Sequence, residues 1–262
     1  MPEHTGHAAG RGDAQEKVNV VRKWRRWLAV GCTHAGHIDR KAWEQVLGFK
    51  ARWRPTETIH LGDFLDTAAW RAGARHSSDD PDKTSSFSDD YLHGMTHLKE
   101  LAPTRIHLGN HENRVFALTK SSSAVVAYAA EQGVQAIEQG AKKLKAQLYP
   151  YDIEGGLSLL GDTVFLHGFQ CSESAVRDTV ESMGRGVVMA HLHRPEITRG
   201  RVIGSPVGIC TGTLANIGAM GYARQRRATY RWGHGFAYGE FCQDACVSWL
   251  ATPVKGEWRF PL

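Results

Sequence analysis

The chain has 262 residues, of which 42% are hydrophobic and 23% are charged, and its net charge at pH 7 is +5. This composition is typical of a globular protein with a sizeable core, and no run of eighteen or more apolar residues occurs, so we expect no membrane contact. The modest positive charge favours polyanionic partners without identifying one.

The N-terminal stretch "MPEHTGHAAGRGDAQEK" lacks the basic flank, apolar centre and small-residue cleavage site of a secretory signal. We interpret residues 1–20 as a disordered arm and residues 21–262 as a single domain. The cysteines are odd in number and form no CxxC pair, so we expect no disulfide framework and a cytoplasmic location. The five cysteines are Cys32, Cys171, Cys210, Cys242 and Cys246.

The first strong strand signal is the apolar run of "RKWRRWLAVG", which ends at Gly31. Residues 41–54 carry apolar side chains at helical spacing, and Pro55 closes the predicted helix. "TETIHLGDFLD" predicts a short strand with acidic residues at its exit. Residues 72–85 are polar and rich in turn formers, which predicts an exposed loop, and residues 86–101 predict another helix.

A further strand, "TRIHLGNHEN", again ends in glycine and a polar residue of ligand type. Residues 114–148 are alanine-rich and helix-forming, with a break near 121–123, and we expect them to form a helical cap over the site. "LSLLGDTVFLHG" indicates a hairpin, and "GVVMAHLH", "VGICTGT" and "ACVSWLAT" indicate buried strands. Because helices alternate with strands early and hairpins dominate late, we expect an α/β domain with mixed sheets.

Residues of metal-ligand type follow apolar, strand-like runs at five places. In open α/β sheets, the loops beyond the carboxyl ends of strands converge on one crevice, so five such loops can serve one site. Side chains at i and i+2 on a strand share a face, which lets "CTH" and "HLH" each offer two ligands together. This mixture of ligands suits manganese, iron or zinc. The five groups are Cys32 and His34; Asp63 and Asp66; Asn110 and His111; His167; His191 and His193.

In this order, the residues resemble the calcineurin-like metallophosphoesterase superfamily, whose signature is DxH, GDxxD, GNH with a following acidic residue, a lone His, and GHxH. The corresponding stretches here are "CTH", "GDFLD", "GNHE", "HG" and "AHLH", and the resemblance spans residues 28–193. It implies two packed mixed β-sheets flanked by helices. The tail from "GICTGTL" to "WGHGFAYGEF" also resembles phage and prophage members of the superfamily.

The resemblance also implies a binuclear metal-dependent phosphoesterase with two divalent ions of iron, zinc or manganese. Such a pair lowers the pKa of a bridging water, and the resulting hydroxide attacks phosphorus in line with the leaving oxygen. His111 inherits the role of assisting the leaving group, and Asp66 the role of orienting that histidine. The implied ligands are Cys32, His34, Asp63 and His193 for the first metal, and Asp63, Asn110, His167 and His191 for the second.

Two residues depart from the signature. Ala190 replaces a glycine, which is tolerated unless its φ is positive. Cys32 replaces an aspartate. A thiolate keeps the single negative charge, binds zinc or ferrous iron well, disfavours manganese and magnesium, and makes the site oxidisable. The alternative is that Cys32 is a small buried residue and the first metal is weakly held or absent. A nucleophilic cysteine is disfavoured, because no phosphate-cradling loop with an arginine follows it.

Several other residues allow both a functional and a structural interpretation. His37 is a candidate to contact substrate and His234 is a candidate to line the cleft, whereas the strand histidines His60 and His107 are interpreted as structural. The two residues after His111 are candidates either to reach a substrate or to cap the next helix. These two residues are Glu112 and Asn113.

The arginines and aromatic residues of 224–232 offer charge and stacking surfaces for a nucleic-acid strand, although a solvated basic loop explains them equally well. On this feature we expect a phosphodiesterase acting on a phosphate ester, with a nucleotide or nucleic acid as the candidate substrate. The alternatives are a catalytically decayed relative that binds nucleic acid or protein, and a one-metal hydrolase. The sequence leaves the oligomeric state open.

Overall fold

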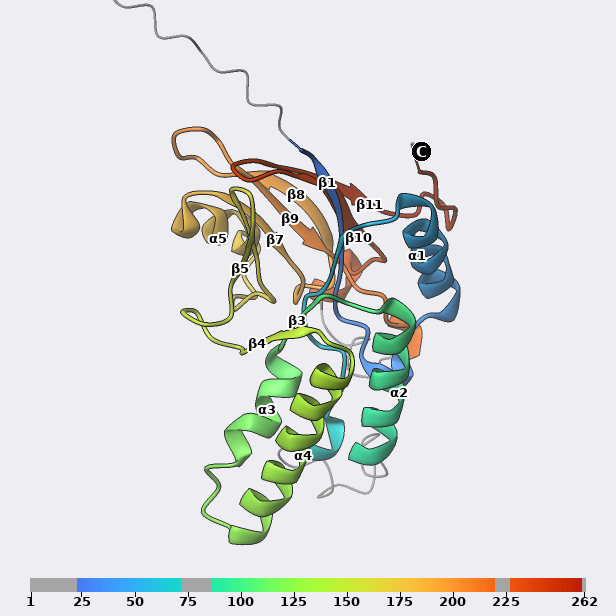
Figure 1. Ribbon diagram of the computed structural model, residues 1–262, viewed down its shortest axis with the longest axis vertical. Coiled ribbons are helices and arrows are strands. Elements are labelled where there is room, and N and C mark those ends of the chain that lie inside the picture. Colours follow the sequence, from blue (N-terminus) through green and yellow to red (C-terminus); the bar gives the residue numbers. More distant parts are fainter. Residues whose placement is uncertain (1–22, 72–85, 220–226, 261–262) are drawn as a thin grey trace, which may run out of the picture.

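The structure of the protein is a computed structural model, and it describes residues 23–71, 86–219 and 227–260 (Figure 1). The predicted N-terminal arm and the predicted loop at 72–85 lie outside these residues. The chain forms two mixed β-sheets flanked by helices, which confirms the expected fold class. None of the helices in the described ranges combines the length and the hydropathy that crossing a membrane requires.

The first sheet has six strands in the order β11-β10-β1-β2-β3-β4. The four strands from β1 to β4 are parallel, whereas β10 and β11 add an antiparallel hairpin beside β1. Their bounds are β1 Arg25–Val30, β2 Glu57–His60, β3 Arg105–His107, β4 Gln147–Tyr149, β10 Phe236–Phe241 and β11 Cys246–Ala251.

The second sheet has five strands in the order β5-β6-β7-β9-β8. The predicted hairpin is present, since β5 and β6 pair antiparallel across Gly161 and Asp162, and β6, β7 and β9 run parallel. Their bounds are β5 Ser158–Leu160, β6 Thr163–Phe165, β7 Gly186–Met189, β8 Pro195–Arg199 and β9 Val207–Thr211.

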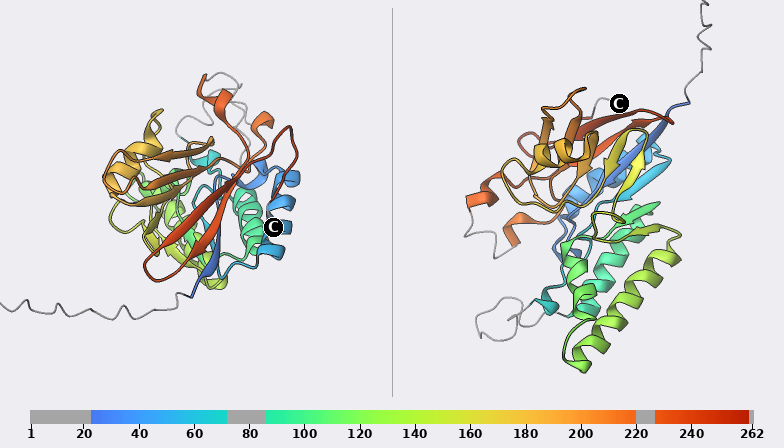
Figure 2. Two further views of the ribbon diagram at one scale, coloured as in Figure 1. Left: turned by 90° about the horizontal axis from the view of Figure 1, so that it is seen from above. Right: turned by 90° about the vertical axis from the view of Figure 1, so that its left-hand side faces the viewer.

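The alternating side chains of β1 explain how the layers pack. Leu28 and Val30 join a cluster with helix α1, Arg40–Trp53, while Trp27 and Ala29 point into the core between the sheets. On the other side of the molecule, helix α5, Ala175–Met183, covers the second sheet (Figure 2). The layers are therefore helix, sheet, sheet, helix.

The remaining helices are α2 Phe87–Leu101, α3 Asn110–Leu118 and α4 Ala124–Lys143, which lie together at one end of the molecule in Figure 1. The predicted break near 121–123 separates α3 from α4. Two boundaries differ from the sequence prediction, because α3 begins at Asn110 and residues 147–149 form β4. Helix α4 packs on α2 and β3 through Ile137 and Ala141, and a capping role for this segment stays a prediction. Short 3-10 helices are η1 Ala35–His37, η2 Ala68–Trp70, η3 Ile217–Ala219 and η5 Arg227–Arg231.

The buried ring of His107 makes stability depend on pH. Its Nδ1 donates to the Gly156 carbonyl at 2.8 Å, its Nε2 contacts Ser158 Oγ at 3.0 Å, and the ring stacks on Tyr149. Burial lowers the pKa of His107 to about 3. Between that value and the ordinary value near 6.5, the unfolded chain binds one proton more than the folded chain, so stability falls as the pH falls.

We therefore expect His107→Gln to flatten the pH dependence of stability. In chelator-treated protein, urea unfolding between pH 6.5 and 4.5 should give a slope smaller than that of the wild type by up to about 1.4 kcal/mol per pH unit. His93→Gln, on the exposed face of α2, is the matched control and should keep the wild-type slope. An unchanged slope in His107→Gln would contradict the expectation.

Candidate metal centre

All five groups of motif residues follow the carboxyl end of a strand. The loops after β1, β2 and β3 leave the first sheet, and the loops after β6 and β7 leave the second sheet. These strands run parallel within their own sheets, so their carboxyl ends meet at one edge. The sequence prediction that these loops converge describes the structure well.

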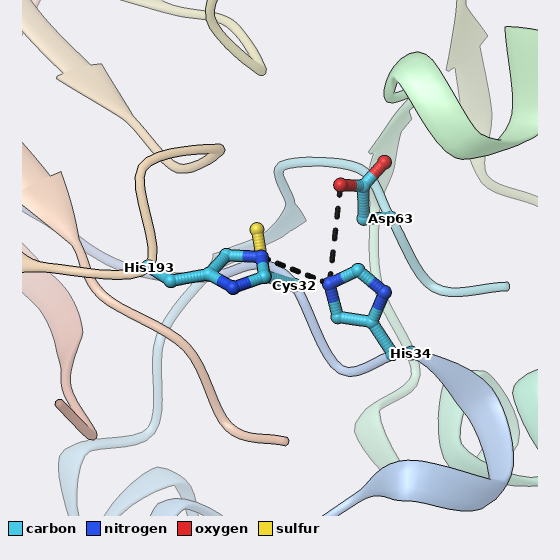
Figure 3. Close-up of side chains that lie close together, drawn as sticks. All are labelled: Cys32, His34, Asp63 and His193. Atoms are coloured by element: carbon cyan, nitrogen blue, oxygen red, sulfur yellow. Dashed lines mark hydrogen bonds and ion pairs between the residues drawn. The ribbon is translucent and has the colours of Figure 1, made fainter. Parts of the chain in front are cut away.

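The first group of converging side chains contains one thiol, one carboxylate and two imidazoles (Figure 3). One potential ligand atom from each residue lies within 4.8 Å of the others, and all four residues are buried. His34 Nε2 is 3.0 Å from His193 Nε2 and 4.0 Å from Asp63 Oδ2. The group is Cys32, His34, Asp63 and His193.

The hydrogen bonds of His34 direct a lone pair into this group. Its Nδ1 lies 3.1 Å from Asp66 Oδ1, and a carboxylate oxygen accepts, so Nδ1 carries the proton and Nε2 is unprotonated in the neutral ring. His193 Nδ1 is buried without a hydrogen-bond partner among the described residues. The two Nε2 atoms, the thiol and the Asp63 carboxylate form a donor set that fits one soft or borderline divalent ion.

The second group adjoins the first and shares Asp63 with it. His167 Nε2 is 3.3 Å from Asp63 Oδ2, 3.1 Å from Asn110 Oδ1 and 3.2 Å from His191 Nδ1. His167 Nδ1 donates to the Leu61 carbonyl at 2.6 Å, so the neutral ring aims its Nε2 lone pair at two oxygens. Lone pairs facing one another in a buried site need a proton or a cation between them, so this group also fits a divalent ion.

The pKa shifts of the potential ligands also favour metal binding. Burial disfavours the ionised form of Asp63, but His167 and His111 hold the pKa of this carboxyl well below its usual range. Burial likewise opposes the charged form of His167, but Asp63 raises its pKa. Burial lowers the pKa of His191 to about 4 and lowers that of His193, so both rings stay neutral and free to coordinate.

The motif backbones are held in the sparsely populated left-handed region. Such strain in residues other than glycine concentrates at functional sites. The expected explanation for paired ligands, that i and i+2 side chains share a strand face, is wrong: β1 ends at Val30, β7 ends at Met189, and His191 and His193 serve different groups. The motif residues other than glycine with positive φ are Cys32 at 53°, His34 at 48°, Asp63 at 55°, His191 at 69° and His193 at 58°, and Thr67, directly after the second motif, has a φ of 52°.

The close packing of the motif loops explains why two motif positions require glycine and why Ala190 is tolerated at a third. Gly62 has a φ of +97°, and a Cβ on Gly109 would overlap Asp63 Oδ1, so the close approach of these loops requires glycine. Ala190 is not among the residues with positive φ. The alanine at this motif position is therefore tolerated.

Cys32 lies inside the first group and is fully buried. Its Sγ accepts a hydrogen bond from the His191 N–H at 3.2 Å, and its carbonyl accepts one from Thr213 Oγ1 at 2.7 Å. Burial and the neighbouring Asp63 carboxylate raise the pKa of the Cys32 thiol. Metal binding at this position must therefore displace the thiol proton.

Asp66 and His111 are adjacent to the first group and, together with His34, form a further set of side chains close enough to hold an ion. His111 Nδ1 donates to the Asp66 carbonyl at 2.5 Å and lies 3.4 Å from Asp66 Oδ1, which also faces His34. Burial lowers the pKa of His111, but Asp63 and Asp66 outweigh burial and raise it to about 9. The proton on Nδ1 leaves Nε2 as the nitrogen available to a ligand.

Glu112 supports the loops rather than facing a substrate. Its carboxylate is fully buried and accepts from the N–H groups of Asp63, Leu65 and Gly109 at 3.0, 2.7 and 2.7 Å. The bond from Gly109 caps α3, which was one of the two sequence interpretations. Burial and Asp63 raise the pKa of Glu112.

We expect Glu112→Gln to destabilise the protein and weaken metal binding. The amide leaves one buried N–H without an acceptor, which costs about 1–3 kcal/mol in the free energy of unfolding. Denaturant unfolding and metal content measure the two effects. The neighbouring variant Asn113→Ala is the control and should leave both unchanged, and equal behaviour of the two variants would contradict this role.

The remaining histidine candidates divide as follows. His60 Nδ1 accepts from the Gly62 N–H and its Nε2 donates to Thr33 Oγ1 at 3.1 Å, which agrees with a structural role. His234 contacts the Thr213 carbonyl and Asp39, and it belongs to neither group of potential ligands. His37 lies at the rim, 3.8 Å from Asp66 Oδ2.

Sequence reasoning missed three residues at the site. Cys171 Sγ lies 3.1 Å from His191 Nε2, and Asp90 and Arg114 bind the turn that follows Asp66. Asp90 lies in the first turn of α2 beside a second aspartate, and the local pattern does not distinguish the two. Only the tertiary placement of these segments reveals the contacts.

The basic, aromatic cluster at 224–232 is described from residue 227 onward. The ring centroid of Trp232 is 4.3 Å from that of His193, and the Gly233 N–H donates to the His193 carbonyl at 2.9 Å. Tyr230 is 91% exposed, and Arg231 pairs with Glu173 at 3.2 Å. This part of the chain therefore borders the first group of potential ligands.

No model of a protein family matches the chain. It is 24% identical over 191 residues to the Gene 54 protein of Mycobacterium phage D29, covering 66% of this chain and 71% of that protein. It is also 24% identical over 227 residues to the Gene 54 protein of Mycobacterium phage L5, covering 81% of this chain and 88% of that protein.

Among solved structures, vacuolar protein sorting 29 from Cryptosporidium parvum aligns with a TM-score of 0.45 and 11% identity, covering 90% of this chain and 95% of that one. A dimetal phosphatase from Danio rerio aligns with a TM-score of 0.44 and 10% identity, covering 86% and 95%. The order of the motifs, the two mixed sheets and the meeting of the motif side chains at one place agree with what the resemblance of the motifs to the calcineurin-like metallophosphoesterase superfamily implies.

Proposed function

We propose that the protein is a binuclear metal-dependent phosphoesterase. The observation that carries the proposal is the pair of adjoining potential ligand groups that share Asp63, each with a histidine lone pair fixed by a hydrogen bond on the other ring nitrogen. Such second contacts orient histidine ligands in metal sites. The proposed ligands are those implied by the motifs: Cys32, His34, Asp63 and His193 for one ion, and Asp63, Asn110, His167 and His191 for the other.

Two divalent ions, when bound, supply Lewis acidity at the phosphoryl group and a water acidic enough to act as nucleophile at neutral pH. The side chains of the protein hold the two groups of potential ligands in position. Asp63 fixes the two groups relative to each other, since its Oδ1 accepts from the His111 N–H at 3.0 Å while Oδ2 faces His34 and His167. Glu112 in turn holds the loop that carries Asp63.

We assign His111 to the leaving group. In the metal-free protein, Asp63 and Asp66 raise the pKa of His111 to about 9. Because Nδ1 is bound to the Asp66 carbonyl, Nε2 is the nitrogen that would hold a proton and donate it to the departing oxygen. The Asp66 carbonyl and carboxylate fix the ring through Nδ1. A positioned acid of this kind contributes a rate factor of about 10²–10⁴.

For the substrate, we propose a phosphodiester of a nucleotide or nucleic acid. The support is the surface next to His193. The ring of Trp232 packs against the imidazole ring of His193, and Tyr230 and Arg231 are exposed. Aromatic rings stack on bases, and arginine pairs with phosphate. A nucleobase stacked there would lie next to the first group of potential ligands, because Trp232 contacts the ring of His193.

The test is hydrolysis by protein loaded with zinc, iron or manganese. Activity on bis(p-nitrophenyl) phosphate above activity on p-nitrophenyl phosphate, abolished by chelator and restored by metal, supports the proposal. Fully loaded protein that leaves both esters intact would overturn it. Activity that saturates at one ion per chain would instead identify the one-metal hydrolase, and salt-dependent binding of DNA or RNA without turnover would identify the binding relative.

A further inference from the structure

We infer that Asp90 and Arg114, from two different helices, are positioning residues that set the geometry of the Asp66–His111 pair by clamping the turn at Thr67. This inference rests on the proposed phosphoesterase function, in which His111 serves the leaving group. Neither clamp residue belongs to the sequence motifs, and neither is in a group of potential metal ligands.

The carboxylate of Asp90 holds the turn from the side of α2. Its Oδ1 accepts from the Asp66 N–H at 3.0 Å and its Oδ2 accepts from the Thr67 N–H at 2.7 Å. One carboxylate thus satisfies two successive backbone donors. Charge-assisted bonds of this kind are stronger than neutral ones.

Arg114 holds the same turn from α3. One of its guanidinium N–H groups lies 3.0 Å from the Thr67 carbonyl and 3.1 Å from Thr67 Oγ1. Thr67 Oγ1 donates in turn to the His111 carbonyl at 2.7 Å. Every polar group of Thr67 is therefore engaged by Asp90, Arg114 or His111.

The clamp holds Thr67 in an unfavourable backbone conformation. Thr67 is buried with φ of 52° and ψ of 30°, a left-handed conformation that a β-branched residue adopts only when its surroundings impose it. This conformation turns the Asp66 carbonyl toward His111 Nδ1 while the Asp66 carboxylate still reaches His34. Without the clamp, relaxation of Thr67 would withdraw the oxygens that fix the His111 ring.

The variant Asp90→Asn tests the inference, because its amide nitrogen cannot accept the second backbone N–H. The rates to compare are those on a phosphodiester with a p-nitrophenolate leaving group and on one with a more basic phenolate leaving group. If Asp90→Asn misplaces His111, the variant should lose about tenfold or more in kcat on the diester with the basic leaving group and little on the p-nitrophenolate diester. Its metal content should stay unchanged. Asp89→Asn, the exposed neighbour on α2, is the matched control and should match the wild type.

A double-mutant cycle with His111→Asn separates positioning from a general structural defect. If Asp90 acts through His111, adding Asp90→Asn to His111→Asn should cause no further loss. A full additional loss, or an equal loss on both leaving groups, would overturn the inference. Thr67→Val, which removes the bond to the His111 carbonyl without changing side-chain size, should show the same dependence on the leaving group and serves if Asp90→Asn does not fold.

A second measurement keeps the inference separate from the proposed function. If the loaded wild type hydrolyses neither ester, the phosphoesterase proposal fails, and the clamp is then tested by nuclear magnetic resonance of the zinc protein with ¹⁵N-labelled histidine. The hydrogen-bonded Nδ1 proton of His111 should be visible in the wild type and in Asp89→Asn and lost to solvent exchange in Asp90→Asn. Retention of that signal in Asp90→Asn would overturn the clamp.

Discussion

Replacing Cys32 with alanine is expected to lower the metal content from about two ions per chain to about one, because the first group of potential ligands loses its only thiolate. The raised pKa of the buried thiol predicts that loading releases a proton that the alanine variant cannot release. Elemental analysis of anaerobically purified protein counts the ions, and calorimetry in buffers of different ionisation enthalpy counts the protons.

Substitution with cobalt gives an independent test of whether Cys32 binds the metal. Cobalt-loaded wild type should show thiolate-to-metal charge-transfer absorption in the near ultraviolet, and Cys32→Ala should lack it. Cys210→Ala, which removes a second buried thiol that belongs to no group of potential ligands, is the matched control and should keep both ions and the absorption. A wild type with one ion or none, unchanged by Cys32→Ala, would show that the cysteine only packs and that the binuclear mechanism lacks its first ion.

The variant Cys32→Asp restores the residue that the superfamily signature carries. A carboxylate is a harder ligand than a thiolate, so the variant should keep two ions and shift its preference from zinc and ferrous iron toward manganese. It should also resist inactivation by peroxide, because the oxidisable sulfur is gone. Activation by manganese that is equal in both proteins would contradict a role for sulfur in metal choice.

The parts of the site that the sequence predicts are those in which one local pattern carries the information. An apolar run followed by glycine and a ligand-type residue marks the end of a buried strand, and parallel strands bring such ends together. The stretches "GDFLD" and "GNHE" were recognisable for this reason, and their glycines are needed where Asp63 meets Gly109. The division of the potential ligands into two groups follows from the resemblance to the superfamily and not from the local pattern of the five loops.

The parts that could not be predicted depend on tertiary placement. The left-handed backbone of Cys32, His34 and Thr67 has no local signal, because these residues disfavour that conformation and adopt it only under the constraint of neighbouring loops. In the same way, Asp89 and Asp90 are adjacent acidic residues in the first turn of α2, yet only Asp90 reaches the Asp66 turn. Strain and long-range positioning are therefore read from the structure.

Replacing His111 with asparagine is expected to lower kcat by about 10²–10³ on a phosphodiester with a basic leaving group, with much less effect on p-nitrophenolate. Asparagine can still donate a hydrogen bond to phosphate but cannot transfer a proton, so the loss measures the proton delivered to the departing oxygen. The metal content should stay at that of the wild type, because His111 belongs to neither of the two groups that share Asp63 and contacts that carboxylate only through its backbone N–H.

His37 provides the matched control for this prediction, since it is a histidine at the rim of the same site, 3.8 Å from Asp66. His37→Asn should leave the dependence on the leaving group unchanged, even if it alters KM. Equal losses on both esters in His111→Asn would mean that the histidine binds phosphate without protonating the leaving group. That result would also remove the reason for Asp66, Asp90 and Arg114 to fix its ring so tightly.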